Sequence, residues 1–204
     1  MELRDAMTQI SEIRLQMART EVFRGYRAAP VAVSGLLAFL AAGAQTLWIS
    51  APLENLGAYV TLWVGAAVLS AVAAGAGMAI SGRQATHSTW RRRITWLAIE
   101  QFVPCLVAGG FVTAVLLAVA PGTCWILPGL WQVLFSLGVF ASYRLLPRAI
   151  FGVGVFYLAA GVTCLAVARG AHACSPLAMG LPFGAGQLLA AAILYWTLER
   201  GDGE

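Results

Sequence analysis

Six long apolar runs divide this chain, and they restrict its fold more than any other feature of the sequence. Each run approaches the roughly 20 residues that a helix needs to cross about 30 Å of hydrocarbon. Backbone polar groups in lipid must be satisfied within the spanning segment, so we expect helices. The runs cover residues 31–50, 56–80, 98–120, 125–142, 149–168 and 177–198. The sequence therefore predicts an all-α membrane protein with six transmembrane helices in three hairpins.

The composition argues against a soluble domain. Of the 204 residues, 60% are apolar and 11% are charged, so the polar groups are too few to cover a soluble globule. A charge-rich segment precedes the first run, and that run is too long for the apolar part of a secretory signal. We expect an N-terminal cytoplasmic helix (1–29), a transmembrane bundle (30–199) and a cytoplasmic tail (200–204).

The arginines predict the orientation of the bundle. All thirteen basic residues are Arg, and every one except Arg169 falls in the N-terminal segment, the second or fourth connection, or the tail. By the positive-inside rule, both termini are cytoplasmic. The net charge of +4 is explained by this topology and gives no indication of nucleic-acid binding.

Two segments on the cytoplasmic side could contact lipid or a partner. The N-terminal segment places apolar residues on one helical face, which favours a helix in the membrane interface over one that packs under the bundle or pairs with another chain. The second connection carries Arg91, Arg92 and Arg93 between two tryptophans. This cluster suits anionic lipid headgroups or an acidic partner, although its orienting role already explains it.

A stretch that occurs twice suggests an internal repeat. Residues 117–124 and 127–134 resemble residues 165–174 and 181–189. Each copy ends one apolar run, crosses a turn with a cysteine, and opens the next run with Pro, Gly and Gln. The pattern predicts that the last two hairpins are a tandem repeat.

The cysteines of the two turns, Cys124 and Cys174, would lie on the outer side, where thiols can be oxidised. A disulfide between them would join the repeated hairpins. The alternative, which we favour, is that both are free, small, buried side chains.

Pro and Gly at the starts of the fourth and sixth runs are candidate elements of a binding site, because broken helices can expose backbone groups to a cavity. Gln132 and Gln187 could face one another across a pocket for a neutral or apolar ligand. The alternative, slightly favoured, is that each glutamine bonds to a neighbouring helix. The candidate ligand-binding residues are Pro128, Gln132, Pro182, Gly184 and Gln187.

Glu100 is the only acidic residue within the six runs, and Pro104 four positions later removes the helical bond to its carbonyl. The carboxylate could serve a proton path. We favour a structural ion pair with the nearby arginines. No motif for catalysis, for a metal or for another cofactor accompanies it, so an enzyme is the least supported class.

Small residues recur every fourth position on the first two runs, which lets helix backbones approach closely. The two helices are expected to pack on one another or on a partner, such as a second copy of the chain. The ladders are Ser34, Ala38, Ala42 and Thr46, and Ala67, Ala71, Gly75 and Ala79.

The ends of the chain resemble a loose group of small bacterial six-helix membrane proteins. The shared patterns are I-S-E-I-R-L-Q-M-A-R at 10–19, S-G-L at 34–36 and M-G-L-P-F-G at 179–184. The group carries no known activity, and its members often accompany winged-helix regulators, so the resemblance implies only a regulatory context. After the last F-G, this chain has Gln187 where the group suggests a His.

The leading functional hypothesis is a non-enzymatic membrane bundle that binds a partner or a small neutral ligand. A transporter, or the substrate-binding component of one, is the alternative, and a membrane enzyme is the third.

Overall fold

The computed structural model describes residues 28–84, 89–169 and 172–199, and it confirms six helices long and apolar enough to span a membrane. They are α2 (Ala28–Trp48), α3 (Leu56–Gln84), α4 (Thr89–Val119), α5 (Leu127–Ser142), α6 (Ile150–Val167) and α7 (Pro176–Leu194). Short turns η1 (Pro121–Ile126) and η2 (Tyr143–Leu145) flank α5, and π-helical η4 (Tyr195–Glu199) continues α7. No strand occurs in these ranges.

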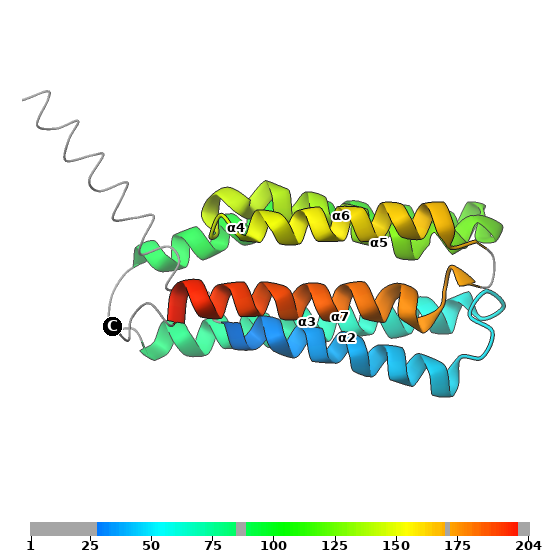
Figure 1. Cartoon of the computed structure of the whole chain (residues 1–204), viewed down its shortest axis with the longest axis horizontal. Helices are drawn as coiled ribbons and strands as arrows, with labels where there is room; N and C mark the ends of the chain where they lie inside the picture. Colours follow the sequence, from blue (N-terminus) through cyan, green and yellow to red (C-terminus); the bar gives the residue numbers. More distant parts are fainter. Residues whose placement is uncertain (1–27, 85–88, 170–171, 200–204) are drawn as a thin grey trace, which may run out of the picture.

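The helices form two layers of three (Figure 1). One layer holds α3, α2 and α7 with α2 in the centre, and the other holds α4, α5 and α6 with α5 in the centre. Between the layers, contact runs mainly from α7 to α6. The packing of α7 is more extensive with α2 than with its sequence neighbour α6. The predicted third hairpin is thus not the main pairing, and the tandem repeat is not confirmed.

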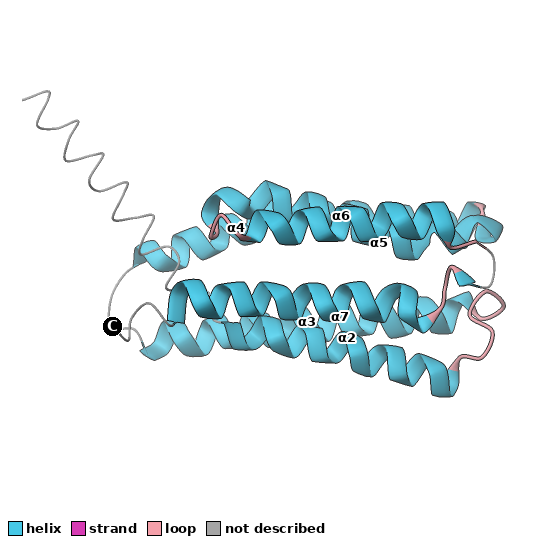
Figure 2. Cartoon of the chain, viewed as in Figure 1, coloured by secondary structure: helices cyan, strands magenta, loops and turns pink. Residues whose placement is uncertain are grey.

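The two ends of the bundle differ in what they hold. The connections 49–55 and 120–126 and the residues 168–169 and 172–175 lie at one end, which we call the distal end (Figure 2). The start of α2 and the end of η4 lie at the other, proximal end (Figure 1). Arg144 and Arg148 are proximal and Arg169 is distal, in line with the predicted grouping of the arginines. The side of the membrane on which each end lies stays a prediction.

Glycines set the closest helix crossings within each layer. A Cβ on Gly161 of α6 would lie 2.8 Å from the Gly129 carbonyl oxygen of α5, and one on Gly129 would lie 2.8 Å from the Gly161 carbonyl oxygen. In the other layer, a Cβ on Gly35 of α2 would lie 3.0 Å from the Gly184 carbonyl oxygen of α7. Backbone lies directly against backbone at these points, which is how helices associate in lipid.

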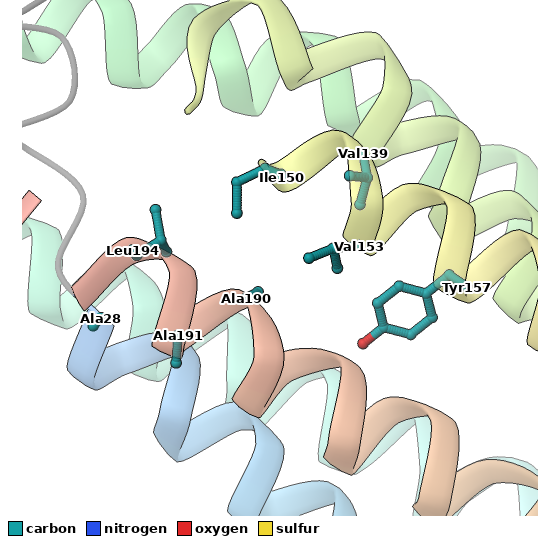
Figure 3. Packing of buried hydrophobic residues seen from close by; sticks show 8 residues of the cluster. All are labelled: Ala28, Val139, Ile150, Val153, Tyr157, Ala190, Ala191 and Leu194. Atoms are coloured by element: carbon teal, nitrogen blue, oxygen red, sulfur yellow. The ribbon is translucent and has the colours of Figure 1, made fainter. Parts of the chain in front are cut away.

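Large apolar and aromatic side chains fill the space between the layers. Figure 3 shows Ile150, Val153 and Tyr157 of α6 near Ala190 and Leu194 of α7. Further along, rings from four helices meet around Phe135 of α5. Its centroid lies 4.7 Å from that of Tyr157, 5.0 Å from that of Phe102 and 5.5 Å from that of Phe183. Side chains rather than backbones therefore join the two layers here.

The outer surface is apolar, as expected for a protein whose solvent is lipid. Few of the described side chains of α3 and α4 are buried, and the exposed ones include Leu69, Leu106 and Phe111. The two small-residue ladders have different surroundings. Ala38 and Ala42 of α2 lie at the crossing with α7, where Ala42 contacts Gly180, whereas Ala67, Ala71 and Gly75 of α3 are not buried by another helix.

Several predictions lie outside the described residues. They are the amphipathic helix within residues 1–27, the tail 200–204, and the lipid or partner contacts of the Arg91, Arg92 and Arg93 side chains.

Candidate functional site: a polar cluster at the distal end

Polar side chains from four helices lie near the distal end of the bundle, and all are buried except Trp131, which is half-buried. Their hydrogen bonds reach from one layer to the other and to the connection before α7. We call them the distal polar cluster; its members are Gln45, Tyr59, Trp63, Thr113, Trp131 and Gln132.

Gln45 joins three segments of the first layer. Its side chain is fully buried, its Nε2 donates to the Cys174 carbonyl oxygen at 2.7 Å, and its Oε1 accepts from Trp63 Nε1 at 2.8 Å. Both ends of the amide are therefore paired. Because a buried unpaired amide is costly, Gln45 is well explained as a structural link between α2, α3 and the connection before α7.

A second chain of bonds joins α4 to α5. Trp131 Nε1 donates to Thr113 Oγ1 at 2.8 Å, and Thr113 Oγ1 donates to the Gly109 carbonyl oxygen at 2.7 Å. The Trp131 ring also stacks on the Tyr59 ring of α3, with centroids 6.5 Å apart and planes 7° from parallel. The Trp131 ring thus contacts α3 in the other layer, and its indole N–H binds α4 in its own layer.

Gln132 repairs the backbone defect that a proline makes in α7. Pro182 lies inside that helix and has no N–H, so the carbonyl oxygen of Ala178, four residues earlier, loses its helical partner. Gln132 Nε2 donates to this oxygen at 2.8 Å. An interhelical bond, the slightly favoured alternative for Gln132, is therefore present at this position, and it links α5 to α7.

Two polar atoms of the cluster have no partner. The Oε1 atom of Gln132 and the hydroxyl of Tyr59 are both buried without a hydrogen bond, and both side chains have 0% exposure. Gln45 has the same type of side chain and the same burial, yet leaves nothing unpaired. Unpaired buried polar groups are uncommon in proteins, and a bound water or small molecule is one of the partners that such groups take.

Gln187 is placed away from Gln132. Gln187 hydrogen-bonds to Tyr157, whose hydroxyl also donates to the Phe183 carbonyl oxygen at 3.4 Å. It follows Ala178 by nine residues, which is about 13 Å along a helix, so the two glutamines lie at different depths. The structure brings Gln132 close to the start of α7 but does not set it opposite Gln187.

The remaining candidates of this region form packing contacts. Pro128 is fully buried in the first turn of α5. Gly184 leaves room for the Phe39 ring, and a Cβ there would overlap it. Helix packing alone explains the presence of Pro128 and Gly184 at these positions. A role for either residue in ligand binding stays a prediction.

Cys124 and Cys174 are free thiols in the structure, and both are fully buried. Burial first, and then the thiols of Cys124 and Cys164, raise the pKa of Cys174 to about 11. Oxidation of Cys124 and Cys174 to a disulfide stays a prediction.

Alkylation of Cys174 should be slow and strongly dependent on pH. Only the thiolate reacts, and a pKa of about 11 leaves roughly one thiolate in a thousand at pH 8, so the rate should rise about tenfold per pH unit up to pH 10. Iodoacetamide labelling followed by peptide mass spectrometry measures this rate, with Ser50→Cys at an exposed position as the control. Equal rates at pH 8 would contradict the prediction, and a peptide that is labelled in denaturant only after reduction would reveal the disulfide.

Glu100 is exposed on α4, which stays one continuous helix through Pro104. Its predicted partners, the side chains of Arg91 to Arg93, lie outside the described part of the chain. Within that part, no group of three His, Cys, Asp or Glu side chains could hold a metal ion.

Sequence reasoning missed five of the six residues that matter here: Gln45, Tyr59, Trp63, Thr113 and Trp131. A signal was present for all but Thr113, because each of the others carries a hydrogen-bonding group within two or three turns of the distal end of a span. Thr113 offers no such signal, since a threonine can bond within its own helix anywhere.

The distal polar cluster is therefore a set of neutral amide, indole and hydroxyl groups with one unpaired acceptor and one unpaired hydroxyl. Comparison with known proteins finds no matching family model, no matching curated protein and no matching solved structure.

Proposed function

We propose that this polytopic protein is a non-enzymatic binding protein of a bacterial inner membrane that holds a small neutral molecule between its two helix layers. The observation that carries the proposal is the pair of unpaired buried polar atoms, Gln132 Oε1 and the Tyr59 hydroxyl. Leaving such atoms without a partner costs about 1–3 kcal/mol each, and a bound molecule would remove that cost.

The chemistry of the cluster supports binding rather than turnover. The buried polar side chains of the described residues are Gln45, Thr113, Gln132, Ser136 and Ser142. Amides and hydroxyls of this kind bind by hydrogen bonds, but they do not exchange protons near neutral pH as general acids and bases do. A neutral ligand suits them, because a charge would meet no counter-charge in this low-dielectric setting.

The proposal predicts that a small molecule stays with the protein during gentle purification. Native mass spectrometry of the chain in lipid nanodiscs should show a mass above that of the polypeptide, and mild denaturation should release a neutral compound. Nanodiscs that hold an unrelated helical membrane protein are the control for lipid carry-over. Recovery of the bare polypeptide alone would contradict the proposed function.

A further inference from the structure

We infer that Gln132 Oε1 and the Tyr59 hydroxyl are the two anchor points of one ligand, a neutral molecule with a flat apolar body and a hydroxyl or N–H donor. This inference rests on the proposed function and makes it specific. Neither atom has a partner, although each belongs to a side chain with 0% exposure.

The Gln132 and Tyr59 side chains lie beside the same turn of α7. Gln132 bonds to Ala178 in the first turn of α7, and Tyr59 packs in one cluster with Met179, the next residue of that turn. On the other side, the ring that stacks on Tyr59 belongs to Trp131, the sequence neighbour of Gln132. One small molecule beside the start of α7 could therefore reach both atoms.

The unpaired atoms determine what the ligand must offer. An amide oxygen only accepts, so the ligand must donate to Gln132 Oε1. The Tyr59 hydroxyl donates or accepts, so it can bind the same ligand hydroxyl or a second polar atom. The Tyr59 and Trp131 rings and the Met179 side chain supply an apolar wall, which favours a flat body of aromatic or similar type.

The position suits a ligand that enters from the distal side. Tyr59 is in the first turn of α3, and Gln132 is in the second turn of α5. At 1.5 Å per residue, both lie within about 8 Å of the distal helix ends. A molecule from the aqueous phase therefore has a short way to the anchor points, and the proximal half of the bundle is filled by the aromatic and apolar contacts around Phe135 and Leu194.

Phenol and toluene make a matched pair of probes, because they share the flat ring and differ in the hydroxyl. Titration calorimetry of each into the full chain in detergent, with protein-free micelles as the blank, should show saturable binding of phenol but not of toluene. Tyr59→Phe should weaken phenol binding roughly fivefold to tenfold, since a net hydrogen bond is worth about 1 kcal/mol. This variant should fold, because the hydroxyl it removes has no partner within the protein.

Tyr157→Phe is the control variant. It removes a buried tyrosine hydroxyl outside the distal polar cluster that already donates to the Phe183 carbonyl oxygen, so it should lower the melting temperature and leave phenol binding at the wild-type value. Equal binding of phenol and toluene, equal binding by the wild-type chain and Tyr59→Phe, or no saturable binding of either probe would overturn the inference. The last result would leave water alone as the occupant.

The failure of this site can be told from the failure of the proposed function. If Tyr59→Phe still retains the co-purified molecule in nanodiscs at the wild-type level, the protein binds a ligand elsewhere and only the anchor points are wrong. If the wild-type chain retains nothing and does not bind phenol, both are wrong.

Discussion

Replacing Gly161 with valine is expected to remove about 3 kcal/mol from the free energy of unfolding. The Cβ would lie 2.8 Å from the Gly129 carbonyl oxygen and 2.9 Å from the Val133 backbone nitrogen. Backbone atoms in the middle of a helix cannot turn aside as a side chain can, so α5 and α6 would have to separate. Overpacking of this kind typically costs about 1–3 kcal/mol, and two further methyl groups place valine near the top of that range.

The measurement is the midpoint of unfolding in sodium dodecyl sulfate, followed by far-ultraviolet circular dichroism in mixed micelles. Gly152→Val is the matched control, because Gly152 lies on the same helix, is exposed, and has nothing within 4 Å of the position that a Cβ would take. The control should change the free energy of unfolding by less than about 1 kcal/mol. Similar losses for both variants would mean that the crossing with Gly129 does not explain the effect, because valine has a higher helix propensity than glycine at either position.

The helices could be predicted from the sequence because their determinant is local. A run of about 20 apolar residues has one stable backbone conformation in lipid, whatever its neighbours are. The predicted run 56–80 corresponds to α3 at Leu56–Gln84, and the run 149–168 to α6 at Ile150–Val167. The structure differs mainly at the proximal ends, where α3 and α4 continue as helix into residues that hydropathy assigned to the connection.

The arrangement of the helices could not be predicted in the same way. Lipid is as apolar as leucine, so burial does not decide which helices pair, and close backbone approach decides instead. The small residues of α2 do mark a packing face, but the sequence does not say that α7 covers it. The same ladder on α3 is left uncovered, which shows that such a pattern permits a contact without specifying one.

Some residues of the candidate site could be predicted from the sequence, but the contacts between them could not. The sequence offers Pro182 and Gln132 as unusual residues in spans, and each was a candidate. Their relation is visible only in three dimensions, where the amide of one helix meets the carbonyl oxygen that the proline of another helix has freed. Tyr59 was not predicted, since a tyrosine near the end of a span is ordinarily an interfacial anchor.

This relation between Gln132 and Pro182 leads to the second large effect. Gln132→Met should lower the free energy of unfolding by about 1–2 kcal/mol, because it leaves the half-buried Ala178 carbonyl oxygen without a donor. In a Pro182→Ala background the same change should cost much less, since alanine restores the N–H that bonds to this oxygen within α7. The two substitutions should therefore be coupled by about 1 kcal/mol or more in a double-mutant cycle.

The cycle separates this effect from the loss of packing around Pro182, which is buried and leaves space when its ring is removed. The packing loss caused by Pro182→Ala is the same whether position 132 is Gln or Met, so it cancels when the coupling free energy is calculated. Gln45→Met provides the comparison, because its bonds go to Trp63 and to the Cys174 carbonyl oxygen and should cost the same with or without Pro182. Gln132→Met could instead lower the free energy of unfolding by the same amount in the Pro182→Ala background as in the wild-type chain. The bond to the Ala178 carbonyl oxygen would then not be the source of the stability that Gln132 provides. The unpaired Oε1 atom would be the only remaining polar role of this side chain.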